Sequence, residues 1–337
     1  MLARLIAAVR SPAGRLVAGA LGLAGVALIV RGIGLGVVAD SLAGAVRLFP
    51  AVVALEGVRL ACTVLALRAL YDRPVPIAPL ARAGLIGYAV MGLVPAGRAV
   101  AEVARATMLA RYVGATRAAV AAVRIQGASL VANALISLLA AAAVWLSLRA
   151  GAPAWLSLAI LGNAAVTLVP GIVLLSVSAR TRLGAWVARL SRRRPFGAGV
   201  AEALEEGPKG ALSAVGWEFL GRVLEVAQYA ILLACVGGAP TPRLAFTAEG
   251  IHLVGAAVGD LLPAHLGTTE GNFTLAASAL ALPVASAVSI ALLAHLAQLL
   301  WVLAGSGASL FWSAPTPDPM AAPHPQAVKV AEGDPVP

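Results

Sequence analysis

The sequence predicts an all-α integral membrane protein, a polytopic helical bundle of about six full spans plus two re-entrant helical hairpins in an inverted repeat. Composition indicates the class, because 60% of the 337 residues are hydrophobic and only 12% are charged. Soluble proteins carry roughly 25% charged residues. Long apolar runs such as "LVAGALGLAGVALIV" and "SLLAAAAVWLSL" indicate spanning helices. A repeated, proline-broken segment indicates the hairpins.

The full spans are the apolar stretches that can cross a hydrocarbon core of about 30 Å. They are expected at about 15–39, 46–70, 118–147, 155–179, 213–237 and 284–312. With the hairpins they make a transmembrane domain over residues 15–312. The preceding segment, 1–14, has no small-residue cleavage site and is expected to be retained in the cytoplasm. A basic loop at 180–212 is also expected to be cytoplasmic, and the proline-rich tail 313–337 to be disordered.

Two segments of the chain are similar to each other. "GYAVMGLVPAGRAVAE" (87–102) and "GAAVGDLLPAHLGTTE" (255–270) share seven of sixteen positions at an offset of 168 residues. In each, a proline among small residues interrupts an apolar stretch, and in lipid the freed backbone groups need protein or water nearby. We therefore expect two hairpins, at about 78–113 and 244–282. Their arms are 78–94, 98–113, 244–260 and 265–282, and their breaks lie at Pro95, Gly97, Pro263 and Gly267.

Arginine and lysine residues set the predicted orientation. With both termini in the cytoplasm and each hairpin returning to its own side, fifteen basic residues are cytoplasmic and three lie on the opposite side. Three full spans separate the hairpins, so the second hairpin should enter from the opposite face. Paired broken segments of this kind are typical of a transporter's midplane site. The formal net charge of +10 is explained by this topology, and no nucleic-acid partner is expected.

The first hairpin carries three charges on one predicted helix face. Arg98, Glu102 and Arg105 stand at i, i+4 and i+7 after the break. Charges are costly inside a membrane and tend to be functional. A carboxylate flanked by two guanidinium groups leaves net positive charge, which suits a phosphate-bearing headgroup. The alternative is an Arg–Glu–Arg lock that only holds the hairpin together.

The second hairpin tip, "DLLPAHLGTTEGN", is polar but contains no arginine. Glu270 is open to three interpretations: a proton-coupled carboxylate, a partner for an arginine across the bundle, or a helix-start residue. The tip's candidate substrate-binding residues are Asp260, Thr268, Thr269, Glu270 and Asn272.

A second group of intramembrane charges precedes each hairpin, as Glu56 with Arg59 and Glu218 with Arg222. Glu218 and Arg222 are one turn apart, which favours a satisfied intrahelical pair. Cys62 and Cys235 lie in apolar stretches and are expected to be inert. Histidine and cysteine spacing fits no metal site, no catalytic residue set is recognisable, and no cofactor is expected.

At the hairpins the chain resembles the flippase-like transmembrane family typified by the membrane domain of lysylphosphatidylglycerol synthase. "PAGRAVAEVARATMLARYVG" is similar to that family's Pro-x-Arg…Glu-x-x-Arg segment, and "LLPAHLGTTEGNFTLAASAL" to its Pro-Gly-Gly-x-Gly-x-x-Glu segment, although Ala264 and His265 replace two glycines. The similarity covers about residues 15–312. The motif residues carried over are Pro95, Arg98, Glu102, Arg105, Pro263, Gly267 and Glu270.

The resemblance implies a multi-pass protein of the bacterial inner membrane that binds or moves a phospholipid or another lipid-linked anionic headgroup. It does not imply an enzyme, because the aminoacyl-transferase domain of some relatives is missing from this sequence. Two alternatives stay open: an integral-membrane enzyme that modifies lipid headgroups, and a non-transporting membrane partner of a lipid-modifying enzyme.

Overall fold

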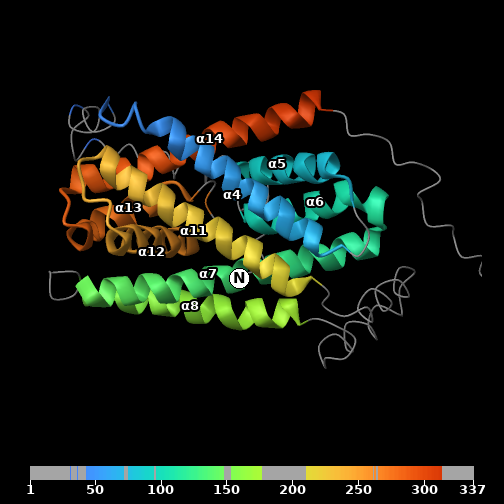
Figure 1. The fold of residues 1–337 in the computed structure, drawn as a ribbon, viewed down its shortest axis with the longest axis horizontal. Helices are drawn as coiled ribbons and strands as arrows, with labels where there is room; N and C mark the ends of the chain where they lie inside the picture. The colour runs from blue at the N-terminus through green and yellow to red at the C-terminus, as the bar shows by residue number, and fades with distance from the viewer. Residues whose placement is uncertain are drawn as a thin grey trace, which may run out of the picture.

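The computed structural model describes residues 43–71, 75–94, 96–147, 153–176, 210–260, 262 and 265–312, with the isolated positions 31 and 36. These ranges are helical and contain no strand. The helices lie roughly along one direction in a single bundle (Figure 1). They are α4 (Phe49–Ala69), α5 (Ile77–Leu93), α6 (Gly97–Val113), α7 (Ala115–Ser147), α8 (Ala154–Leu175), α11 (Ala211–Cys235), α12 (Pro242–Val258), α13 (Thr268–Leu275), the 3₁₀ helix η3 (Ala277–Leu280) and α14 (Val284–Phe311).

Four helices of the described ranges are long and apolar enough to cross a membrane. They are α4, α7, α8 and α14, and they match the spans predicted at 46–70, 118–147, 155–179 and 284–312. The span predicted at 213–237 forms α11, whose 25 residues are long enough to cross but include Glu218, Arg222 and Glu225. The predicted span 15–39, apart from two positions, lies outside the described residues, as do segments 1–14, 177–209 and 313–337.

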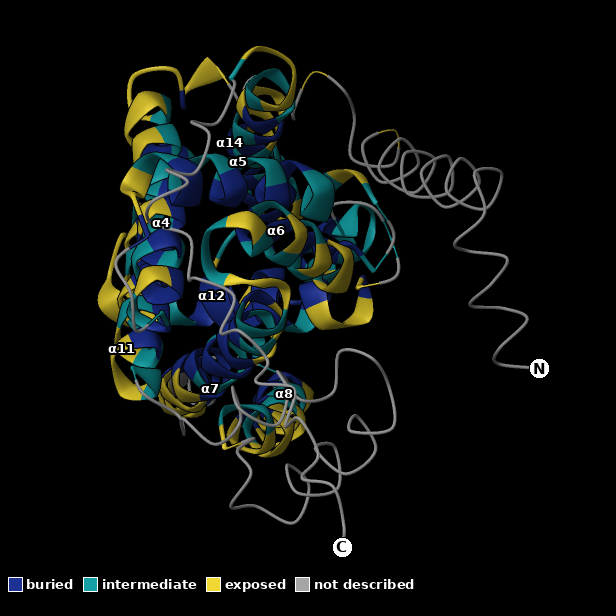
Figure 2. Cartoon of the chain, turned by 90° about the vertical axis from the view of Figure 1, so that its right-hand side faces the viewer, coloured by how far each residue is buried: buried dark blue, intermediate teal, exposed yellow. Residues whose placement is uncertain are grey.

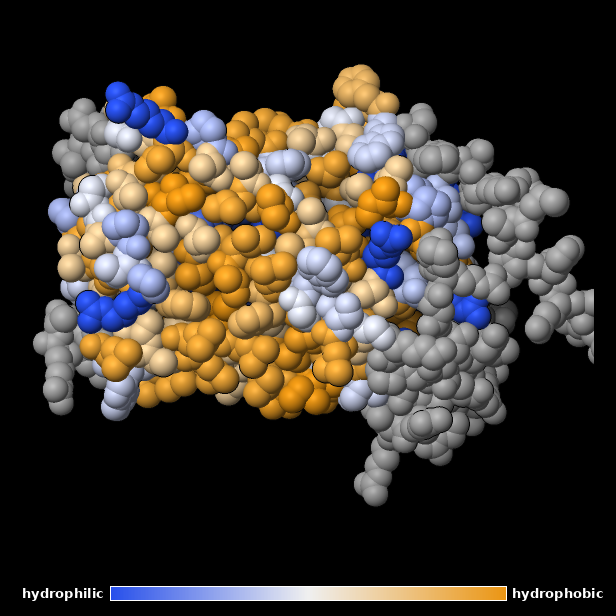
Figure 3. Space-filling model, viewed as in Figure 1, coloured by the Kyte–Doolittle hydropathy of each residue, from blue (hydrophilic) through white to orange (hydrophobic). Residues whose placement is uncertain are grey.

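The outer surface of the bundle is apolar around its middle. A broad hydrophobic band separates two ends where hydrophilic residues gather (Figure 3). On α8, Leu158, Val166 and Val169 are 64–73% exposed. Contiguous apolar surface on this scale is unfavourable in water, and it is what a helix that faces lipid requires. The described helices therefore have the surface of a membrane protein.

In a view along the bundle from one end, the buried residues lie on the inner sides of the helices. Helices α12 and α6 lie nearest the middle of the view, with α14, α4, α11, α7 and α8 around them, and buried residues face inward (Figure 2). Small side chains dominate the core, as expected where helices must approach closely without a hydrophobic driving force. The largest buried cluster joins α7, α8, α11, α12 and α14, with Tyr229 and Phe273 stacked at a centroid distance of 6.0 Å.

The first predicted hairpin is a pair of 17-residue helices, α5 and α6, packed against each other. The turn between them places Ala96 in the left-handed region at φ 53°. Gly97 then starts α6 directly beside α5, because a Cβ there would lie 2.2 Å from the Met91 carbonyl oxygen. Only glycine allows that approach. Pro95 itself lies outside the described residues.

The second hairpin differs from its prediction. Its first arm is α12, but the arm predicted as one helix over 265–282 is an eight-residue helix, α13, followed by the short 3₁₀ helix η3. Thr268, Thr269, Gly271 and Asn272 are poor helix formers, and Ala281 ends η3 at φ 53°. These poor helix formers nevertheless lie inside α13, whereas the α-helix ends where Ala and Leu, which are good helix formers, follow. Helix propensity therefore does not explain why this arm is short. Pro263 lies outside the described residues.

The two hairpins lie in opposite halves of the bundle, and their turns touch. In Figure 1, α5 and α6 occupy the right half and α12 and α13 the left half. The backbone N–H of Ala96 donates a hydrogen bond of 3.2 Å to the carbonyl oxygen of Asp260. The interruption in each repeat is thus brought to the same place, in the middle of the bundle.

Candidate functional site

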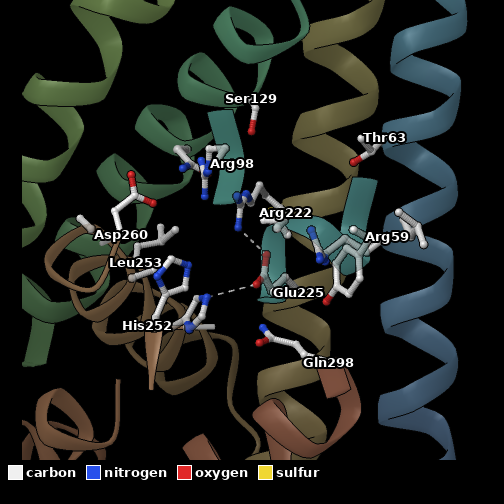
Figure 4. Close-up of a pocket in the computed structure, with 18 of the residues that line it drawn as sticks. Arg59, Thr63, Arg98, Ser129, Arg222, Glu225, His252, Leu253, Asp260 and Gln298 are labelled. Carbon is white, nitrogen blue, oxygen red and sulfur yellow. Dashed lines mark hydrogen bonds and ion pairs between the residues drawn. The ribbon is translucent and has the colours of Figure 1, made fainter. Parts of the chain in front are cut away.

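A cavity of about 1060 Å³ opens where the two turns meet. Side chains from α4, α5, α6, α7, α8, α11, α12 and α14 line it, and Figure 4 shows several of them pointing into one space. Its ionisable members are Arg59, Tyr88, Arg98, Glu102, Arg105, Glu218, Arg222, Glu225, His252, Asp260, His265 and His295. Four arginines and four carboxylates at the centre of an apolar bundle are costly to maintain, which identifies this cavity as the candidate site.

Helix α6 supplies three of these charges from one face, as its sequence predicts. Arg98, Glu102 and Arg105 all line the cavity. Arg105 Nη1 donates a short hydrogen bond to Glu102 Oε1, and the Arg105 side chain lies across Gly87, where a Cβ would be 2.3 Å from its Nε. Arg98 forms no ion pair within 4 Å with any described residue. The expected Arg–Glu–Arg set is therefore one pair and one guanidinium group left for another anion.

Arg98 points into the cavity near Asp260 and Arg222 (Figure 4). Both Asp260 and Glu218 act on it through space, but neither is close enough to form an ion pair. A guanidinium group offers five donors in a planar fork that matches a phosphate or carboxylate. At this position, Arg98 can bind a phosphate or carboxylate in the cavity without first breaking an ion pair with a described residue.

A second cluster of charged and polar side chains is formed by residues of α4, α5, α11 and α12. Glu56 and Arg59 are paired at 2.6 Å, and the Tyr88 hydroxyl donates a short hydrogen bond to Glu56. Arg222 pairs with Glu225 at 2.6 Å. Glu225 Oε1 is 3.5 Å from His252 Nε2. The two ion pairs each lie within one helix, and the Tyr88–Glu56 hydrogen bond and the Glu225–His252 contact connect neighbouring helices at the wall of the cavity.

The predicted Glu218–Arg222 pair is wrong. Arg222 turns instead toward Glu225 and toward α12, where Glu249 Oε1 is 3.9 Å from its Nη1. Both Glu218 and Glu225 are within reach of Arg222 along α11, and the packing of α12 decides between them. Glu218 is left lining the cavity, and its Oε1 has no hydrogen-bond partner among the described residues.

The polar residues of the second tip are used mostly within the tip itself. Thr268 donates to the His265 carbonyl oxygen at 2.7 Å, Thr269 to the same oxygen at 3.5 Å, and Asn272 to the Ile251 carbonyl at 2.6 Å. None of these three lines the cavity. Of the tip's predicted binding residues, only Asp260 does.

Glu270 is fully buried and lies outside the cavity lining. Its Oε2 accepts the Gly267 backbone N–H at 2.8 Å, and its Oε1 lies 2.7 Å from His295 Nδ1. It occupies the third position of α13, where a carboxylate can accept free N–H groups of the first turn. Within the described part of the chain its charged or polar side-chain partner is His295, and no arginine pairs with it.

The family follows from comparison with known proteins. A family model described as the lysylphosphatidylglycerol synthase TM region matches residues 15–307. The chain belongs to this family. It is therefore a multi-pass membrane protein that contains a lysylphosphatidylglycerol synthase TM region, as the motif resemblance implied. No curated protein and no solved structure matches it.

Within this lysylphosphatidylglycerol synthase TM region, sequence reasoning missed Glu249 and the roles of Glu225 and His252. Glu249 is fully buried on α12. It is the acidic residue in the mostly apolar helix "PRLAFTAEGIHLVGAAV", and a carboxylate in the middle of such a stretch is itself a signal. The repeat drew attention to the hairpin tips instead. In the described ranges, no group of three or more histidine, cysteine or acidic side chains is placed to hold a metal ion.

Proposed function

We propose that this protein binds an anionic lipid headgroup in the central cavity and moves it between the leaflets of a bacterial inner membrane, as a flippase rather than an enzyme. The observation that carries the proposal is the placement of Arg98, without an ion-pair partner among the described residues, in a cavity where two helix breaks touch. A headgroup phosphate would complete the pairing of this arginine with two parallel hydrogen bonds.

The proposed topology is an inverted repeat of two re-entrant hairpins. Among the described residues, three helices, α7, α8 and α11, separate α5–α6 from α12–α13 along the chain, so the hairpins enter from opposite leaflets if these three are the crossings between them. The opposite positions of the hairpins in Figure 1 and the Ala96–Asp260 contact support this arrangement. With six full spans, both termini are cytoplasmic. A site between two such breaks can be reached from either leaflet by small movements of the hairpins.

A lipid suits the cavity better than a free anion does, because part of its lining is also part of the apolar outer surface. Leu93 on α5, Val166 on α8 and Leu299 on α14 line the cavity and are 57%, 73% and 48% exposed. Near these residues a headgroup can occupy the charged centre while its acyl chains remain in the hydrocarbon phase. The protein then has to replace the hydration of the headgroup alone.

The test is headgroup translocation in reconstituted vesicles. Acyl-labelled fluorescent phosphatidylglycerol is incorporated, and a membrane-impermeant quencher reports the fraction in the outer leaflet with time. Arg98→Ala should slow protein-dependent translocation by about a hundredfold, since a bidentate charged contact contributes about 3 kcal/mol. Arg243→Ala is the matched control, because Arg243 is exposed at the start of α12 and does not line the cavity.

Three outcomes would contradict the proposal. Equal translocation by wild type and Arg98→Ala would remove the cavity arginine from the mechanism. Chemical conversion of the lipid by the purified protein would favour the enzyme alternative. Binding of phosphatidylglycerol that depends on Arg98, without any translocation, would favour a partner of a lipid-modifying enzyme.

A further inference from the structure

We propose that Glu249 is a proton-binding site linked to the headgroup site, so that binding of an anionic headgroup takes up one proton at α12. The linkage rests on the proposed function; the proton site does not. Glu249 is not among the motif residues and does not line the cavity. Arg222 lines the cavity and also lies near Glu249, so it connects the two sites.

The Glu249 side chain is buried and lacks hydrogen bonds. Its exposed fraction is zero, and neither carboxylate oxygen has a hydrogen-bond partner among the described residues. Among the described residues, Glu249 has two buried carboxylate oxygens without a hydrogen-bond partner, whereas Glu102 and Glu218 have one each. An ionised carboxylate without hydrogen bonds in an apolar interior is very costly, and binding a proton removes that cost.

Glu225 and Glu249 compete for Arg222. Its Nη1 is 2.6 Å from Glu225 Oε2 but 3.9 Å from Glu249 Oε1. Glu225 also lies 3.5 Å from His252. One guanidinium group thus serves two carboxyl groups, and it makes its hydrogen bond with Glu225 only. Glu249 is the member of the cluster that is left for a proton.

The remaining surroundings do not offer Glu249 another cation within ion-pair distance among the described residues. Neither α8 nor η3 contains an ionisable residue, and the acid of α13, Glu270, is held by His295. The other ionisable groups on the elements that pack around Glu249, and on α12 itself, are Glu218, Tyr229 and Cys235 on α11, Arg117 and Arg124 on α7, and Arg243 and His252 on α12. Arg59 and Glu56 on α4 act on Glu249 through space.

The linkage follows from Arg222. With Glu249 protonated, Arg222 keeps its pair with Glu225, and its remaining N–H groups can turn toward an anion in the cavity. With Glu249 ionised, its charge draws Arg222 toward α12 and weakens the anion site. Protonation of Glu249 and headgroup binding therefore favour each other, and the effect is reciprocal. A proton that binds with the headgroup in one leaflet and leaves with it in the other couples lipid movement to the pH difference across the membrane.

The proton site is tested by infrared difference spectroscopy of the full-length protein in lipid nanodiscs during a pH titration. The carbonyl stretching band of a protonated carboxyl group should disappear as the pH rises, shift in deuterated water, and be absent from Glu249→Gln. Glu270→Gln, which alters the other fully buried glutamate of the second hairpin, should retain the band. A band that persists in Glu249→Gln, or no such band in wild type, would overturn the inference.

The linkage is tested by binding of short-chain phosphatidylglycerol to the same preparations. Wild-type affinity should fall about tenfold as the pH rises through the titration seen in the infrared spectrum. Glu249→Gln should bind independently of pH, with the affinity of wild type at low pH. In wild type at constant pH, adding the lipid should also strengthen the carboxyl band, which tests the linkage without any substitution.

These outcomes separate the two proposals. The linkage would be overturned if phosphatidylglycerol binding by Glu249→Gln still depended on pH, or if adding the lipid left the carboxyl band of wild type unchanged. Absence of phosphatidylglycerol binding at every pH would count against the proposed function and the linkage, whereas the infrared band would still decide whether Glu249 holds a proton.

Discussion

The two hairpins share a sequence pattern but use its final carboxylate in opposite ways. Glu102, in the first hairpin, pairs with Arg105, lines the cavity, and keeps one oxygen unpartnered among the described residues. Glu270, the aligned residue in the second, is fully buried outside the cavity, with its oxygens held by the Gly267 N–H and His295. One carboxylate faces the site, and the other holds the tip together.

The difference arises from the helix that follows each break. Helix α6 runs regularly for 17 residues, so side chains at i, i+4 and i+7 repeat on one face and reach the cavity. Helix α13 has eight residues, and most of its hydrogen-bonding groups are used to close its own turn. The second half contributes charge to the site from α11 and α12 instead. A repeat in sequence can therefore preserve the backbone break while the binding chemistry moves to other elements.

The largest expected effect comes from joining the two turns covalently. Ala96→Cys with Asp260→Cys, in a chain with Cys62→Ala and Cys235→Ala, should form a disulfide, because the backbones of residues 96 and 260 are already hydrogen-bonded. If the turns separate during each translocation step, oxidation should stop headgroup movement in the vesicle assay. A reducing agent should restore it.

Each single cysteine variant, treated with the same oxidant, serves as the control for that experiment. Undiminished translocation with a fully formed disulfide would show that the turns stay together throughout. The two hairpins would then act as one rigid unit, and access would have to change elsewhere in the bundle.

The next effect separates the two aligned glutamates. Glu270→Ala should lower the free energy of unfolding by about 3 kcal/mol, because it removes a fully buried carboxylate and leaves the partly buried His295 and the Gly267 N–H without their partner. Glu102→Ala should cost less stability, since its side chain borders a cavity, but should slow translocation by releasing Arg105. Chemical unfolding in detergent and the vesicle assay measure the two effects. Equal effects of the two substitutions in both measurements would show that the halves are used symmetrically, and a reversed ranking would show that the roles of the two glutamates are exchanged.

The sequence predicted most of the described helices, but it did not predict the break between α13 and η3 or all of the side-chain pairing. Apolar length predicted α4, α7, α8 and α14, and the proline breaks predicted two hairpins whose first arms match α5 and α12. The spacing of Arg98, Glu102 and Arg105 on α6 placed three cavity residues correctly. These features depend on local periodicity and on composition, both of which can be read from a single chain.

The rest depends on contacts between distant segments. Whether Arg222 pairs with Glu218 or with Glu225 is decided by α12, which is not visible from the spacing on α11. The burial of Glu249 follows from helix packing in the same way. The local use of Thr268 and Asn272 depends on carbonyl groups at residues 265 and 251. A list of polar residues at a tip does not distinguish those that close a turn from those that face a ligand.

The smallest effects compare a glycine in each hairpin. Gly97→Ala should destabilise the protein by about 2 kcal/mol, because the new methyl group would lie 2.2 Å from the Met91 carbonyl oxygen, and backbone atoms cannot move aside as a flexible side chain can. Gly271→Ala, in α13, meets no atom within 4 Å and should stabilise it by about 0.5 kcal/mol through better helix propensity. Unfolding measurements in detergent should therefore move in opposite directions. Equal destabilisation by both would mean that α13 is as tightly constrained as the start of α6.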